Sequence, residues 1–178
     1  MKIKNLMVIQ ITDVSKVKVC IIIGSSLEVE LDDISMYSMG HLLYQILMKK
    51  YQLKKEQVKV YYPESQTRYC PMNSYIQIHD KLYQIIDKQF FIDLIPFKSI
   101  DDIDTGSDGN TELLFFLINH GANDHFGSRY PFSYDSIITF IQNIAFKHLS
   151  LFIDCCSAGS IITMMNAANK VIESCSEF

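Results

Sequence analysis

The sequence predicts an α/β fold, with a mostly parallel sheet covered by helices on both faces. Short runs of β-branched and other apolar residues alternate along the chain with longer segments whose apolar residues recur at helical spacing. That alternation is typical of strand–helix–strand units, which build parallel sheets. The chain has 178 residues, of which 48% are hydrophobic. Residues 1–178 are therefore expected to form a single domain with a core of its own.

In the first half of the chain, the strands are recognised by their β-branched residues and by the glycine or proline that stops them. The expected helix between them has leucine and isoleucine on one face. The expected elements are a strand at 17–23, a helix at 34–50, a strand at 57–62, a long loop at 63–78 and a helix at 80–91.

In the second half, an acidic, glycine-containing segment is followed by a fully apolar run, which suits a central parallel strand. Ser133 is a suitable N-cap for the next helix, because its hydroxyl can accept a hydrogen bond from a first-turn amide. The expected elements are a solvated loop at 101–110, a strand at 113–118, a helix from Ser133 to about 147, a strand at 149–153 and a helix at 157–171.

Composition excludes several classes of protein. The net charge is -4 and no basic block stands out, so no nucleic-acid partner is expected. No apolar run is long enough to span a bilayer, and the N-terminus is a poor secretory signal, so the sequence assigns no compartment. The five cysteines contain no Cys-x-x-Cys pair, which disfavours a zinc site and a disulfide scaffold and favours reduced thiols.

Two of the predicted strands end in residues that can carry out chemistry. The strand at 113–118 is followed by Asn-His-Gly at 119–121, and the strand at 149–153 is followed by Asp-Cys-Cys at 154–156. In open α/β sheets, functional sites collect at the carboxyl ends of the strands. If the two strands are parallel neighbours, both motifs lie at the same edge of the sheet.

A cysteine nucleophile needs a base close to its thiol, and His120 can supply one from the neighbouring strand end. Gly121 allows a close backbone approach, and its N–H can donate to an oxyanion. Taken alone, a histidine at a strand end is more often structural, and a cysteine in an apolar stretch is usually an inert core residue. Their joint occurrence after two apolar strands favours a catalytic pair. His125, in the polar loop after Gly121, is a rival base.

These motifs resemble those of the legumain family of cysteine peptidases. In that family, an apolar strand ends in His-Gly and is followed by a helix. A second strand then ends in the motif acidic-x-Cys-x-x-Gly-Ser, in which x is any residue. Residues 117–121 and 152–160 match this pattern, and the sequence around Cys156 is also similar to metacaspases. The similarity covers roughly residues 17–165, and the two motifs are its specific part.

The resemblance implies a caspase-like three-layer sandwich and a mechanism. Cys156, two residues after the acidic Asp154, would be the nucleophile and His120 the base, while Cys155 would point into the sheet. The N–H groups of Gly121 and Cys156 would form the oxyanion hole. The reaction would be cleavage of a peptide or protein substrate through a thioester, which requires no metal and no organic cofactor.

The resemblance also implies a substrate pocket lined by Asp154, Ser25 and Asp33, unless Asp154 instead shapes the turn. Either Asp33 or Asp32 would replace the orienting asparagine of the family. Legumains read asparagine with an Arg-His pair, whose positions in this chain fall near Ser35 and Met36. An acidic pocket without its cation favours a positive side chain, because an unpaired buried carboxylate is unfavourable. Lysine or arginine is therefore expected before the cleaved bond.

Two other functions compete with an endopeptidase. A transpeptidase similar to the catalytic subunit of GPI transamidase would pass its thioester to an amine, although no membrane anchor is visible in the sequence. A catalytically degenerate paralogue would bind peptides or proteins without cleaving them. The missing Arg-His pair and the end of the chain soon after Cys156 favour the paralogue, and they suggest a fragment or a reduced family member. The intact His120 and Cys156 favour the enzyme.

Overall fold

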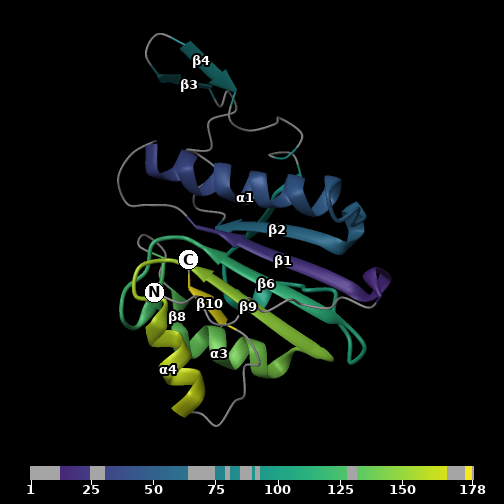
Figure 1. Cartoon of the computed structure of the whole chain (residues 1–178). Coiled ribbons are helices and arrows are strands. Elements are labelled where there is room, and N and C mark those ends of the chain that lie inside the picture. The colour runs from purple at the N-terminus through teal and green to yellow at the C-terminus, as the bar shows by residue number, and fades with distance from the viewer. Residues whose placement is uncertain are drawn as a thin grey trace, which may run out of the picture.

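The computed structural model describes residues 13–24, 31–63, 75–78, 81–84, 90, 93–127, 132–167 and 175–177. Its centre is a six-stranded sheet in the order β10-β9-β6-β1-β2-β5, in which every neighbouring pair is parallel (Figure 1). The strands are β1 (Val17–Ile23), β2 (Val58–Pro63), β5 (Ile95–Phe97), β6 (Glu112–Ile118), β9 (His148–Asp154) and β10 (Cys175–Glu177). The predicted parallel sheet is confirmed.

Helices cover both faces of this sheet, as the sequence predicts (Figure 1). Helix α1 (Leu31–Lys49) lies on one face, and α3 (Tyr134–Asn143) and α4 (Gly159–Ala167) lie on the other. Ser133 is the N-cap of α3, and its hydroxyl accepts a hydrogen bond from the Ser136 amide at 3.1 Å. The described residues thus form an α/β fold of three layers.

Each face of the sheet has its own apolar cluster, because strand side chains alternate between the two faces. The α3 and α4 face buries residues such as Phe115, Leu117, Ile137, Leu151 and Ile161. The α1 face buries residues such as Val19, Ile21, Leu47, Leu114 and Ile118. Strand β1 is buried along almost its whole length, which is why all of its residues except Lys18 are apolar.

The sequence-based prediction was wrong between β2 and β5. Residues 75–78 were expected in a loop and residues 81–84 in a helix, but they form the antiparallel strands β3 (Tyr75–Ile78) and β4 (Lys81–Gln84). Ile76 and Ile78 are separated by one residue in β3, a two-residue period that suits a strand, whereas β4 shows no such period. Strands β5 and β10 were also missed, because three residues are too few to show a period.

Two helix ends and one loop also differ from expectation. Helix α3 ends at Asn143, because the next residue is already extended, and α4 begins at Gly159 after a turn. The acidic loop expected to be solvated starts with the short 3-10 helix Ile100–Asp102 and buries Ile103. The structure also contains the 3-10 helices Val14–Lys16 and Lys55–Gln57 and the short strands β7 (His125–Phe126) and β8 (Phe132–Ser133), which pair antiparallel.

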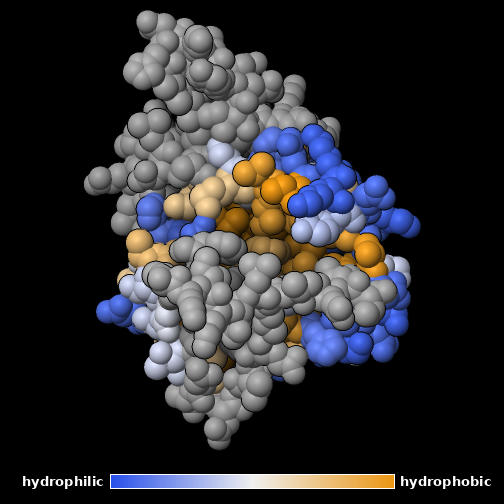
Figure 2. Space-filling model, in the orientation of Figure 1, coloured by the Kyte–Doolittle hydropathy of each residue, from blue (hydrophilic) through white to orange (hydrophobic). Residues whose placement is uncertain are grey.

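The surface of α1 retains apolar side chains. Met39, Leu42 and Ile46 recur at helical spacing and are all exposed, Leu42 to 60%. On the same face of the sheet, Phe116 and Phe152 stack with ring centroids 4.5 Å apart and are only partly buried. Figure 2 shows apolar surface in a hollow beside α1. No helix among the described residues is long and apolar enough to cross a membrane.

The amino ends of β6 and β9 are joined by an ion-pair cluster that predicts an acid-dependent stability. Glu112 lies opposite His148 in the register, and its carboxylate is 2.9 Å from His148 Nδ1 and 3.3 Å from Lys147 Nζ. The hydrogen bond with His148 is the main cause that lowers the pKa of Glu112 below its usual value. A lowered folded-state pKa stabilises the fold above the unfolded value of about 4.3, and that contribution disappears as the pH falls through the folded value.

The variant Glu112→Gln should therefore lower the free energy of unfolding at pH 7 by about 0.5 kcal/mol, the size typical of a surface ion pair. Urea unfolding at several pH values should show that the difference from the wild type closes as the pH falls below about 4.3. Glu56→Gln, at an exposed position on a short 3-10 helix, is the matched control. A difference that is the same at neutral and acid pH would contradict this explanation.

Candidate active site

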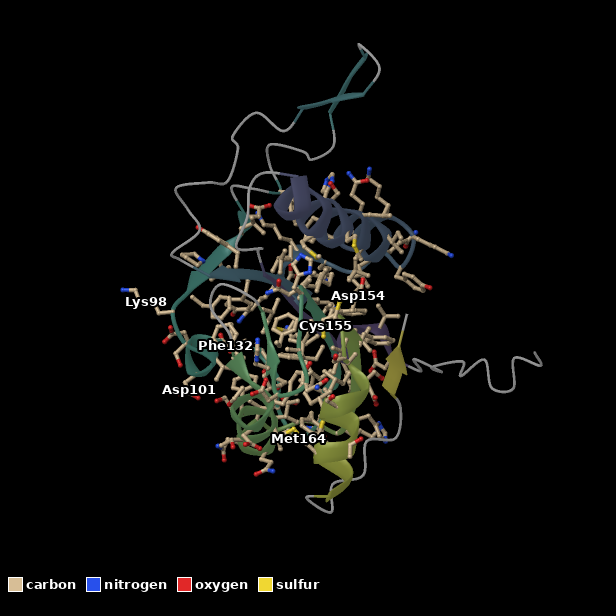
Figure 3. All side chains as sticks on the ribbon, turned by 90° about the vertical axis from the view of Figure 1, so that its left-hand side faces the viewer. Lys98, Asp101, Phe132, Asp154, Cys155 and Met164 are labelled. Carbon is tan, nitrogen blue, oxygen red and sulfur yellow. The ribbon has the colours of Figure 1, made fainter. Side chains whose placement is uncertain are left out.

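The carboxyl ends of β6 and β9 bring the two predicted motifs to the same edge of the sheet. These strands are adjacent and parallel, and their register places Ile118 opposite Asp154. His120 and Cys156 each follow two residues later, so they leave the sheet level with each other. Figure 3 views this edge, with Asp154 and Cys155 between α1 above and α3 and α4 below.

Asn119, the first residue after β6, holds this edge together. Its N–H donates to the carbonyl of Asp154 at 3.1 Å, which extends the β6–β9 pairing by one step. Its side-chain Oδ1 accepts a hydrogen bond from the His120 N–H at 2.7 Å. Only 5% of Asn119 is exposed. The buried side chain of Asn119 therefore holds the backbone of His120, and the backbone of Asn119 is itself hydrogen-bonded to β9.

Gly24 adds the end of β1 to the same assembly. Its N–H donates to the Ile118 carbonyl at 2.9 Å. A Cβ at position 24 would lie 1.4 Å from Nδ2 of Asn119, so the Asn119 side chain occupies the space that any other residue would need. The ends of β1, β6 and β9 thus interlock, and only glycine fits at position 24 while Asn119 keeps this conformation.

After His120 the chain folds into a narrow hairpin. The Ala122 N–H donates to the His125 carbonyl at 2.9 Å, and the Gly127 N–H donates to the His120 carbonyl at 2.7 Å. These bonds flank the antiparallel bridge between Gly121 and Phe126. In such a pair, the N–H of each bridging residue points away from its partner. The Gly121 amide therefore points out of the hairpin, as an oxyanion donor must.

Gly121 lies directly against the cysteine motif. A Cβ at Gly121 would be 2.6 Å from the Cys156 carbonyl oxygen, 2.7 Å from Cys155 Sγ and 3.1 Å from Cys155 Cβ. All three contacts are far closer than van der Waals distance, and one of them is to backbone. The absence of a side chain at Gly121 therefore allows the histidine and cysteine motifs to touch.

The three described cysteines differ in their exposure. Cys20 is buried in the middle of β1, and burial raises the pKa of its thiol strongly, which keeps it protonated and inert. Cys155 is half-buried and packs against the apolar cluster on the α3 and α4 face. Cys156 is exposed. Of these three thiols, Cys156 is therefore the most accessible to a substrate.

A strained turn follows Cys156. Ser157 has a φ of 62°, a left-handed conformation that residues with a side chain adopt rarely. The Ser160 N–H donates to the Ser157 carbonyl at 3.0 Å, and α4 begins at Gly159. The turn therefore places Cys156 just before the N-terminus of a helix, where the helix dipole favours a negative charge.

His125, the rival base, belongs to β7 and lies in the same hairpin as His120. Its Nδ1 is 2.7 Å from a carboxylate oxygen of Asp124, whose side chain is 85% exposed. His120 is half-buried. A carboxylate can orient a histidine, so the Asp124 contact keeps His125 a rival base.

The predicted pocket residues are only partly described. Asp154 is half-buried and, by the alternation along β9, it shares the α1 face with Phe152. Asp33 lies in the first turn of α1, which starts at the carboxyl edge of the sheet (Figure 1). Ser25 lies outside the described residues. The predicted pocket of Asp154, Ser25 and Asp33 therefore stays a prediction.

Two residues of this region were not predicted from the sequence. Asn119 was noted as part of the motif but not as its anchor, and only its place between a strand and His120 could have signalled that role. Tyr134, the first residue of α3, reaches the cysteine motif from a different element. No local signal marks such a contact, because it depends on how α3 packs on the sheet.

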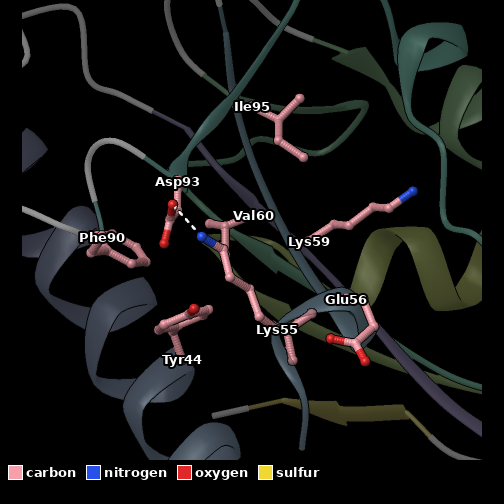
Figure 4. Close-up of a pocket in the computed structure, with 9 residues that line it drawn as sticks. Tyr44, Lys55, Glu56, Lys59, Val60, Phe90, Asp93 and Ile95 are labelled. Atoms are coloured by element: carbon pink, nitrogen blue, oxygen red, sulfur yellow. Dashed lines mark hydrogen bonds and ion pairs between the residues drawn. The ribbon is translucent and has the colours of Figure 1, made fainter.

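A separate pocket of about 460 Å³ lies between α1, β2 and β5, and neither His120 nor Cys156 lines it (Figure 4). Tyr44, Phe90 and Ile95 are among its lining residues, and an ion pair between Lys55 and Asp93 at 2.6 Å lies at its side. A smaller pocket of about 370 Å³ includes Ser133 and also lacks the predicted pair. Among the described residues, no group of three or more His, Cys, Asp or Glu side chains could hold a metal ion.

Comparison with known proteins adds no relative. No family model matches the chain, and no curated protein is significantly similar to it in sequence. The resemblance to legumains therefore stays an interpretation of the two sequence motifs.

The contact at Gly121 predicts that even a methyl group is harmful there. Gly121→Ala should lower the free energy of unfolding by about 1–3 kcal/mol, the usual effect of overpacking, because the Cys156 carbonyl oxygen cannot move without shifting the turn. Thermal or urea unfolding would measure the loss. Gly109→Ala is the matched control, since a Cβ at Gly109 meets no atom within 4 Å. Equal stability of the two variants would contradict the packing described for Gly121.

Proposed function

We propose that this protein is a cysteine endopeptidase in which Cys156 is the nucleophile and His120 is the general base. The observation that carries the proposal is the register of β6 and β9, which brings a His-Gly motif and an exposed cysteine level at one sheet edge. The accessibility of Cys156, compared with buried Cys20 and half-buried Cys155, supports the choice of nucleophile.

In the proposed reaction, the Cys156 thiolate attacks the carbonyl carbon of a peptide bond after its proton has passed to His120. His120 then gives the proton to the leaving amine as the C–N bond breaks, and a thioester remains on Cys156. Water, deprotonated by His120, attacks the thioester and releases the acid. Each step passes through a tetrahedral oxyanion, which needs preorganised hydrogen-bond donors.

The backbone N–H groups of Gly121 and Cys156 are the proposed donors to that oxyanion. The outward direction of the Gly121 amide and its packing against the Cys156 carbonyl support this role. The N-terminus of α4 supports the thiolate in turn, because the helix begins three residues after Cys156. These features need no group that the chain itself does not supply.

The proposal predicts a difference in reactivity between the two adjacent cysteines. Iodoacetamide should alkylate Cys156 at least about tenfold faster than Cys155, because thiolate character and access control the rate. Peptide mapping by mass spectrometry at short times would measure both positions. Cys156→Ala should remove the fast modification, and Cys155→Ala should leave it. Preferential labelling of Cys155 would contradict the assignment of the nucleophile.

The same measurement separates the two histidines. His120→Ala should slow the alkylation of Cys156 at neutral pH, while His125→Ala, one hairpin strand away, serves as the matched control and should change it little. The opposite result would make His125, oriented by Asp124, the base.

The half-buried Asp154 predicts the residue preferred before the cleaved bond. Because Ser35 and Met36 stand near the positions of the Arg-His pair of legumains, an acidic pocket should take lysine or arginine rather than asparagine, which gives the carboxylate a partner. A peptide library incubated with the purified chain and read by mass spectrometry would report the preference. Asp154→Asn should reduce cleavage after lysine and arginine most strongly.

Cleavage after asparagine alone would refute the role given to Asp154. Binding of peptides with no cleavage by the wild type, together with unselective labelling of Cys156, would favour a peptide-binding paralogue over an enzyme.

A further inference from the structure

Tyr134 connects the histidine hairpin to the cysteine motif. It is the first residue of α3 and is completely buried, with 0% of its surface exposed. Its backbone N–H donates to the Asp124 carbonyl at 3.0 Å, within the hairpin that begins at His120. Its hydroxyl lies 3.6 Å from Cys155 Sγ, within hydrogen-bond range for sulfur. One buried residue therefore contacts both the hairpin that follows His120 and the cysteine motif.

Cys155 is the intermediary between Tyr134 and the backbone of Gly121. The Tyr134 hydroxyl contacts Sγ of Cys155, and the Cα of Gly121 packs so closely on the same sulfur that no Cβ would fit. Any sideways movement of the Cys155 side chain would therefore shift the backbone of Gly121. The position of the Gly121 amide relative to the Cys156 backbone depends on this buried contact.

The hydroxyl of Tyr134 is also held in its neutral form. Burial is the main cause that raises the pKa of Tyr134, and the hydrogen bond with Cys155 raises it further. A neutral hydroxyl can donate to sulfur or accept from the thiol. Burial therefore keeps the hydroxyl proton of Tyr134 available at the contact with Cys155.

We propose that Tyr134 is a positioning residue that acts through Cys155 to hold the Gly121 amide in the oxyanion hole. The inference rests on the proposed function, because it assigns a task in the same site. Tyr134 touches neither the substrate nor the reacting atoms in this role. It sets the distance between the two oxyanion donors, which lie beyond the ends of two different strands, β6 and β9.

This role predicts that two reactions of Cys156 respond differently. In acylation by p-nitrophenyl acetate, the sulfur forms a bond to the carbonyl carbon, an oxyanion develops, and the ester C–O bond breaks to release p-nitrophenolate. In alkylation by iodoacetamide, the sulfur displaces iodide at a saturated carbon and no oxyanion forms. A positioning residue of the oxyanion hole affects acylation, whereas a residue that activates the thiolate affects both.

The experiment measures both rates on Cys156 in the full chain by peptide mapping, with Cys156→Ala as the background. Tyr134→Phe should slow acylation about tenfold, a fraction of the loss caused by removing an oxyanion donor outright, and should leave alkylation unchanged within about twofold. Tyr51→Phe, which removes a hydroxyl from a tyrosine that is 52% exposed, is the matched control and should match the wild type in both reactions.

A second pair of variants keeps the test independent of the folding of Tyr134→Phe. Cys155→Ala removes the atom that Tyr134 contacts and should slow acylation in the same way. Cys155→Ser keeps a hydrogen-bonding atom at that place and should restore part of the rate. The double variant Tyr134→Phe with Cys155→Ala should be no slower than Cys155→Ala alone, because both changes break the same link.

The outcomes separate the inference from the proposed function. Acylation of wild-type Cys156 with an equal rate in Tyr134→Phe would overturn the inference and leave the peptidase proposal intact. Equal losses in acylation and alkylation would also overturn it, since they would indicate an effect on the thiolate or on the fold. No selective acylation of Cys156 in the wild type would overturn the proposed function and the inference together.

Discussion

The parallel pairing of β6 with β9 determines where every residue of the candidate site lies. Ile118 stands opposite Asp154, so the two strands end level and the chain leaves both of them at the same edge. The register is fixed by burial, since alternate residues of both strands fill the apolar cluster under α3 and α4. A slip by one residue would turn those side chains to the other face, at a large loss of buried apolar surface.

Much of the fold is predictable from the sequence because the central strands are rich in apolar residues. Strand β1 matches its predicted bounds, β6 begins one residue earlier than predicted, and β9 is one residue longer at each end. The short strands β5 and β10 escape prediction for a physical reason. A three-residue segment is too short to show the two-residue alternation of a strand. Such a segment becomes a strand because an existing sheet edge offers it hydrogen bonds.

Some features of the candidate site could likewise be predicted from the sequence, and others could not. The nearness of the two motifs follows from a general rule about strand ends, so it could be predicted from residues 119–121 and 154–156 alone. The close packing of Gly121 on Cys155, the contact with Tyr134 and the left-handed backbone of Ser157 could not. They depend on how α3 and a tight turn meet the sheet, which no local window of sequence contains.

The overlap between Gly24 and the Asn119 side chain has a consequence for how this sequence can change over time. A Cβ at position 24 would occupy the place of Nδ2 of Asn119, so neither position is independent of the other. A larger residue at 24 becomes acceptable only after residue 119 has become smaller, and that step removes the amide that holds the His120 N–H. Position 24 should therefore vary only after position 119 has changed, and a lineage that did not need the His120 N–H to be held would be released from the restriction first.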